Sequence, residues 1–142
     1  MLKFLRFNIG GFFDGYDEIR LWIYKHSAKY EVLAMNFHRI EDFNLYEKKR
    51  LPLSNPERLS EWDALDVNSW ADEYYQCACD GTQWRLTYRE DGKETRRING
   101  SNAYPPQWKQ FIEWLDALMP EMRFANYIEE NEDIDEDERN ST

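Results

Sequence analysis

Residues 84–119 read WRLTYREDGKETRRINGSNAYPPQWKQFIEWLDALM, and this stretch contains a strand, a turn, a second strand and a helix. Apolar and polar residues alternate from Trp84 to Arg89, which is typical of a strand with one buried face. The turn over residues 90–92 then leads into a second strand over residues 93–98. A three-residue turn with Gly92 in the left-handed conformation would pair Trp84 with Ile98.

This register separates the apolar side chains of the hairpin from the basic ones, whereas a shift of one residue would invert every side chain. One face would carry Trp84, Leu86, Tyr88 and Ile98. The other would carry four cationic residues, Arg85, Arg89, Lys93 and Arg97. We call this second set the basic hairpin face.

A helix follows, since Pro105 and Pro106 precede the clearest helical pattern in the chain and Pro120 ends it. Its apolar residues recur at intervals of three and four, which places them on one stripe. The stripe consists of Trp108, Phe111, Ile112, Leu115, Leu118 and Met119. We expect it to cover the apolar face of the sheet, with Trp108 packed against Trp84.

The first part of the chain contains further strand patterns. Apolar residues alternate with polar ones in two runs, Leu5, Phe7 and Ile9, and then Ile19, Leu21 and Ile23. A third extended run covers residues 30–38. Residues 45–53 predict a fourth strand at a sheet edge, because Lys48-Lys49-Arg50 and Pro52 would oppose pairing with another chain.

Two more elements connect these strands to the hairpin. Ser54 and Glu57 fit a capping box, which predicts a short helix over residues 56–65. Residues 73–79 predict a strand that Asp80-Gly81 joins to the strand at Trp84. The sequence therefore predicts an α+β fold, an antiparallel sheet of about five to seven strands packed on one side by two or three helices.

The acidic residues are concentrated near the end of the sequence. The chain has 142 residues, of which 28 are acidic and 18 basic, and its formal net charge is −10. Residues 129–142 carry −7 of this charge and residues 1–128 carry −3. Mutual repulsion with almost nothing apolar to bury predicts disorder. We therefore expect a single globular domain over residues 1–128 and a disordered acidic tail over residues 129–142.

The sequence contains no recognisable motif for catalysis or cofactor binding. The three glycines of residues 10–15 match neither glycine-rich phosphate-binding pattern. Cys77 and Cys79, with His26 and His38, could supply four zinc ligands, but their spacing is not that of a zinc knuckle. We expect two buried, reduced thiols, no metal, no cofactor and no catalytic residue.

Two groups of residues are candidates for binding a partner. Phe12, Phe13 and Tyr16 lie around the loop between the first two strands, where exposed aromatic side chains would anchor an interface. The alternative is that they fold back onto the core. The basic hairpin face would bind an acidic protein or the phosphates of a nucleic acid. The alternative there is a solvated face with Asp91 and Glu94 nearby.

About a quarter of the chain resembles a recurring C-terminal pattern of small, uncharacterised bacterial proteins. The matching residues are Asp80-Gly81-x-x-Trp84-x-Leu86-x-Tyr88, Asp91-Gly92, Gly100-Ser101-Asn102-Ala103-Tyr104-Pro105, Trp108 and Phe111. The resemblance implies a strand–hairpin–helix unit and implies no catalytic residue.

These features favour a small acidic bacterial protein that works by binding. No run approaches the roughly 20 apolar residues of a membrane-spanning helix, and residues 1–7 lack the apolar stretch of a signal peptide. We expect a cytoplasmic protein that binds no membrane. The leading hypothesis is a non-enzymatic inhibitor or immunity-type protein that masks another protein. The alternatives are a nucleic-acid-associated accessory protein that uses the basic hairpin face, and a small enzyme of unrecognised kind.

Overall fold

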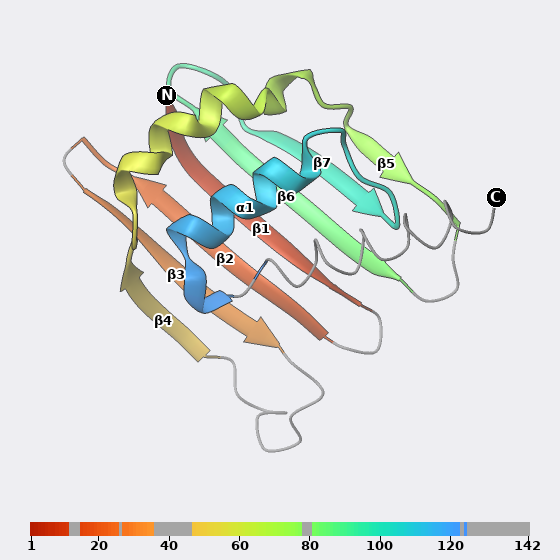
Figure 1. The fold of residues 1–142 in the computed structure, drawn as a ribbon, viewed down its shortest axis with the longest axis horizontal. Helices are drawn as coiled ribbons and strands as arrows, with labels where there is room; N and C mark the ends of the chain where they lie inside the picture. The colour runs from red at the N-terminus through yellow and green to blue at the C-terminus, as the bar shows by residue number, and fades with distance from the viewer. Residues whose placement is uncertain (12–14, 26, 36–46, 78–80, 123, 125–142) are drawn as a thin grey trace.

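The computed structural model describes residues 1–11, 15–25, 27–35, 47–77, 81–122 and 124. These residues form one seven-stranded sheet with the strand order β4-β3-β2-β1-β6-β7-β5 (Figure 1). The strands are β1 (Leu2–Gly11), β2 (Gly15–Ile23), β3 (Ala28–Met35), β4 (Glu47–Pro52), β5 (Glu73–Tyr75), β6 (Thr82–Glu90) and β7 (Arg96–Ser101). The described helices are α1 (Trp108–Leu118) and the 3₁₀ helices η2 (Pro56–Leu65), η3 (Val67–Ser69) and η4 (Pro120–Met122). The α+β class is therefore confirmed.

The sheet is mostly antiparallel, and one strand corrects the prediction of a wholly antiparallel sheet. β5 pairs in parallel with β7, with Glu73 opposite Asn99 and Tyr75 opposite Ser101. The strand predicted over residues 73–79 is shorter, Glu73–Tyr75, and it does not pair with β6, because β1 and β7 already occupy both edges of β6. The remaining edge of β7 is the one that β5 joins.

The hairpin of β6 and β7 has the predicted faces but a different register. Leu86 lies opposite Ile98 and Trp84 lies opposite Gly100, a shift of two residues from the predicted pairing. A shift of two leaves each side chain on its face. The close approach of Trp84 to Gly100 gives the physical reason, since a Cβ atom on Gly100 would lie 1.9 Å from Trp84 Nε1. Gly92 has the predicted left-handed conformation, with φ of +73°.

One face of the sheet carries the core. Leu5, Phe7 and Ile9 of β1 are fully buried, and α1 and η2 lie across this face (Figure 1). The predicted helical stripe is confirmed, because all six of its residues are buried. The indole rings of Trp84 and Trp108 are 4.8 Å apart between centroids, which confirms the predicted packing. None of the described helices is long and apolar enough to cross a membrane.

Residues 56–65 form a helix, but of the 3₁₀ type, and it begins differently from the prediction. Asn55 is the N-cap, and no side-chain hydrogen bond caps η2, so the capping box of Ser54 and Glu57 is not formed. Asn55 Nδ2 instead donates to the carbonyl oxygen of Ala117 at 2.6 Å. The start of η2 is thus tied to the end of α1 rather than to its own first turn.

Arg96 connects η3 and the chain after it to the sheet. It shares a face of β7 with Ile98, and its guanidinium donates to the carbonyl oxygens of Val67, Asn68 and Trp70. Arg96 Nη1 also donates to the hydroxyl of Tyr88 at 3.2 Å. We call this guanidinium and its acceptors the Arg96 cluster.

Candidate functional site

The face of the sheet opposite α1 is uncovered by any described helix and carries mostly polar and charged residues. Alternation along the paired strands places one row of partners, Arg20, Arg6, Thr87 and Arg97, across β2, β1, β6 and β7. A second row, Glu18, Asn8, Arg85, Asn99 and Glu73, follows across β2, β1, β6, β7 and β5. We call this surface the open face.

The open face is positively charged. Among residues with described side chains, it carries six cations: Arg6, Arg20, Lys29, Arg85, Arg89 and Arg97. Its acids are Glu18, Glu31 and Glu73. A net of three positive charges therefore lies on one face of a body whose residues 1–128 carry −3 in total.

Glu18 neutralises part of this charge. Its Oε1 accepts from Arg6 Nε at 2.7 Å and from Asn8 Nδ2 at 3.3 Å, and its Oε2 lies 3.4 Å from Arg20 Nη2. The Glu18 side chain is 12% exposed, whereas that of Arg6 is 45% exposed. One largely buried carboxylate is thus held by two arginines and an asparagine within the open face.

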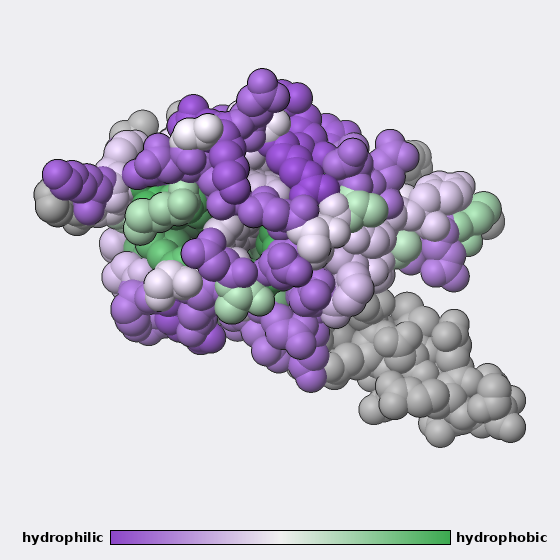
Figure 2. Space-filling view, turned by 90° about the horizontal axis from the view of Figure 1, so that it is seen from above, coloured by the Kyte–Doolittle hydropathy of each residue, from purple (hydrophilic) through white to green (hydrophobic). Residues whose placement is uncertain are grey.

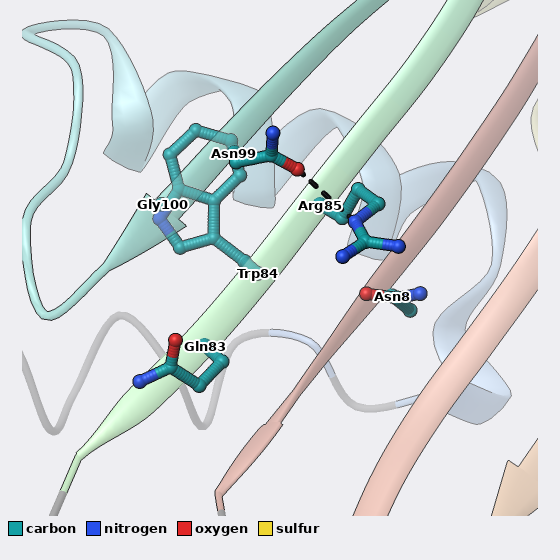
Figure 3. Close-up of a pocket in the computed structure, with 6 residues that line it drawn as sticks. All are labelled: Asn8, Gln83, Trp84, Arg85, Asn99 and Gly100. Carbon is teal, nitrogen blue, oxygen red and sulfur yellow. Dashed lines mark hydrogen bonds between the residues drawn. The ribbon is translucent and has the colours of Figure 1, made fainter. Parts of the chain in front are cut away.

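A hollow of about 330 Å³ lies beside this ion pair (Figure 3). It is lined by Asn8, Gln83, Trp84, Arg85, Asn99 and Gly100. Arg85 Nε donates to Asn99 Oδ1 at 3.0 Å, and Gln83 Nε2 donates to Ser101 Oγ at 2.9 Å. The guanidinium of Arg85 extends toward Asn8 (Figure 3). The hollow therefore combines one cation with three amide side chains.

An aromatic pair lies at the end of the open face. The rings of Phe4 and Trp22 are 5.9 Å apart between centroids, and both side chains are half-buried. Phe4 lies opposite Arg89, and Trp22 lies opposite Lys29. This end of the face therefore offers apolar rings between two cations.

The structure brings together three of the four residues of the basic hairpin face. Arg85, Arg89 and Arg97 are exposed on the open face. Lys93 is exposed in the turn between β6 and β7, so the prediction that it lies on the strand face is wrong. The longer turn that follows from the observed register is the reason.

The structure describes only some of the other predicted site residues. Tyr16 belongs to β2 and lies opposite Gly10, whereas Phe12 and Phe13 lie outside the described residues. Cys77 is exposed, which corrects the prediction of a buried thiol. Its exposure follows from β5 ending at Tyr75, two residues before it.

The remaining zinc candidates, Cys79, His26 and His38, lie outside the described residues, and so does the whole predicted acidic tail, residues 129–142. Within the described part of the chain, no group of three or more His, Cys, Asp or Glu side chains could hold a metal ion.

Sequence reasoning missed the neutral part of the site, namely Asn8, Gln83 and Asn99, and the two arginines around Glu18. The available signal was their position, since each one lies on the polar face of a strand whose opposite face is mostly apolar. What joins them is pairing between strands far apart in the chain.

No protein-family model matches the chain, and neither the curated proteins nor the solved structures contain a significant match to it.

Proposed function

We propose that this is a non-enzymatic binding protein of inhibitor or immunity type, which masks an acidic surface of another protein in the bacterial cytoplasm. The observation that carries the proposal is the segregation of charge, with a net positive open face on an otherwise acidic body. Complementary charge steers association and selects partners. Arginine, which supplies five of the six cations, also binds carboxylates through two parallel hydrogen bonds.

The polar character of the surface supports a partner recognised by charge and hydrogen bonding. Seen from above, along the sheet rather than onto the open face, the molecule is mostly hydrophilic, with hydrophobic areas between polar ones (Figure 2). Among the described residues, only Met1, Tyr24 and Tyr75 are large exposed hydrophobic side chains. A large apolar interface is therefore a poorer account of this surface than an arginine-rich one.

The aromatic pair favours a second candidate, a nucleic-acid-associated protein. Bases stack on aromatic rings while cations follow the backbone, and the half-buried rings of Phe4 and Trp22 lie between Arg89 and Lys29. Against this reading, three carboxylates share the face, and residues 129–142 add a net charge of −7 that opposes phosphates.

Photo-crosslinking tests whether a protein partner uses the open face. Thr87 lies between Arg6 and Arg97 in register, so a benzoylphenylalanine at position 87 should crosslink to a distinct acidic protein in the cells that produce this chain. The matched control is the same photoreactive residue at Glu113, which is exposed on α1. The product at position 87 should disappear when Arg89 and Arg97 are changed to glutamate. Identical products from positions 87 and 113, or products that nuclease removes, would contradict the proposal.

Titration with labelled nucleic acid tests the second candidate. We expect no appreciable binding of single- or double-stranded DNA or RNA at physiological salt, because a net of three positive charges provides few phosphate contacts. Full-length protein and a variant lacking residues 129–142 should be compared by fluorescence anisotropy. Micromolar binding by the full-length protein, falling steeply with salt, would replace the first proposal by the second. Binding seen only after the deletion would assign residues 129–142 as an internal competitor.

A further inference from the structure

We propose that the hollow beside Arg85 is a subsite for a single carboxylate, supplied by a glutamate or aspartate side chain of the protein partner. This inference rests on the proposed function and specifies the chemistry of its central contact. The hollow lies within the open face and is lined from β1, β6 and β7.

The orientation of Arg85 is the first argument. Its Nε donates to Asn99 Oδ1 at 3.0 Å, which orients the guanidinium, whereas Nη1 and Nη2 have no partner among the described residues. Figure 3 shows these nitrogen atoms directed toward Asn8, across the hollow. Two parallel N–H groups held in this way match the two oxygens of a carboxylate.

Glu18 provides the second argument, because it is a carboxylate that an arginine and an asparagine of the open face already bind. There an arginine Nε and an asparagine Nδ2 donate to one carboxylate oxygen, at 2.7 and 3.3 Å. Asn8 belongs to both arrangements, since it donates to Glu18 and also lines the hollow. Arg85 and Asn99 form another arginine–asparagine pair on β6 and β7, in which the arginine donates to the asparagine oxygen, and none of the residues lining the hollow is acidic.

The third argument is the rigidity of the floor of the hollow, which Trp84 and Gly100 form. Trp84 and Gly100 are partners across β6 and β7, and Trp84 Nε1 donates to the carbonyl oxygen of Ala103 at 3.0 Å. The indole of Trp84 stacks on Tyr74 and packs against Trp108. A floor held from three sides keeps the strands that carry Arg85 and Asn99 in place, which reduces the ordering cost of binding.

Size and charge select a carboxylate over a larger or more highly charged group. A volume of about 330 Å³ is at the lower end for ligand pockets and suits one or two residues of a partner chain. The hollow offers one cation, and its amides can also accept hydrogen bonds from a partner's peptide N–H groups. A dianionic phosphate would find only one cation in the hollow to balance its two negative charges.

The test compares two variants that remove the same charge from the same strand. Arg85→Gln alters the hollow, whereas Arg89→Gln alters an exposed arginine of the open face outside it. The probe is the capped peptide acetyl-Ala-Glu-Glu-Ala-amide, for which we expect a Kd on the order of 1 mM. Binding is followed by NMR on the Nε–Hε signals of arginine, and the signal lost in Arg85→Gln identifies that of Arg85.

We expect the peptide to shift the Arg85 Nε–Hε signal and the Asn99 side-chain amide signal. Arg85→Gln should weaken binding at least about tenfold, and Arg89→Gln less than about threefold. Equal weakening by both variants, equal binding of the glutamine version of the peptide, or no shift up to about 20 mM peptide would overturn the subsite. Equal binding of inorganic phosphate would also overturn it, as a site for any anion.

The two proposals fail in distinguishable ways. If the crosslink at position 87 persists while these peptide results are negative, the open face binds a protein without this subsite. If position 87 yields no specific protein product, the proposed function itself is wrong.

Discussion

Phe111→Ala is expected to lower the free energy of unfolding by about 3–5 kcal/mol, which is a large share of the stability of a small domain. The side chain is fully buried in α1, where its ring lies 5.3 Å from that of Phe7 and 5.4 Å from that of Trp70. It therefore fills the space between the helix, the central strand and the segment after η3. Its removal leaves a cavity that rigid aromatic neighbours fill poorly.

Urea unfolding followed by circular dichroism measures this loss. The matched control is Glu113→Ala, which truncates an exposed side chain of the same helix and should change stability by less than about 0.5 kcal/mol. If both variants unfold at the midpoint of the parent, the apolar stripe of α1 is not the core face. In that case the stripe would be a docking surface instead.

Alternation along single strands carried most of the information that the sequence held about this fold. Trp84, Leu86 and Tyr88 are buried and Arg85 and Arg89 are exposed, as the hairpin pattern predicts. The pairing of the strands was wrong by two residues, because the pattern repeats every two residues and does not distinguish registers of equal parity. Only the contact of Trp84 with Gly100, which depends on three-dimensional packing, decides between them.

Local sequence patterns could not predict contacts between segments that are far apart in the chain. The parallel pairing of β5 with β7 depends on which strand edge is left free once β1 and β6 have paired. Trp114 was not assigned to the helical stripe, yet it is buried, because its Nε1 donates to the carbonyl oxygen of Arg58 in η2 at 2.7 Å. An indole can be buried when its N–H group finds a hydrogen-bond acceptor, but here the acceptor is 56 residues away in the sequence.

The candidate site was likewise predictable only in part. Its cations were predicted from the alternation within β6 and β7, whereas the hollow requires Asn8 of β1 to lie next to Arg85. Arg96 was overlooked although the sequence contains a signal for it. It occupies an apolar-face position, adjacent to Arg97 on the polar face, and a cation at such a position needs hydrogen-bond acceptors nearby.

Arg96→Met is the other substitution with a large expected effect, a loss of about 2–3 kcal/mol of stability. Methionine keeps the apolar stem but leaves the carbonyl oxygens of Val67 and Trp70 without the charged donor that now binds them. Hydrogen bonds to a charged group contribute more than neutral ones, and the 26% exposure of the Arg96 side chain keeps the loss below that of a fully buried cation. The ion pair with Asp72 adds little, because the Asp72 side chain is 81% exposed.

Tyr88 connects Arg96 to the side chain of Asn68. Its hydroxyl donates to Asn68 Oδ1 at 2.7 Å while it accepts from Arg96, and burial raises the pKa of the phenol, which favours this protonated form. Arg97→Met is the matched control, since it removes a neighbouring guanidinium that is exposed on the open face, and it should change stability by less than about 0.5 kcal/mol. Thermal and urea unfolding of both variants measure the difference. Equal stability of Arg96→Met and Arg97→Met would mean that water replaces the guanidinium at these carbonyls, and that η3 does not depend on Arg96 for its place on the sheet.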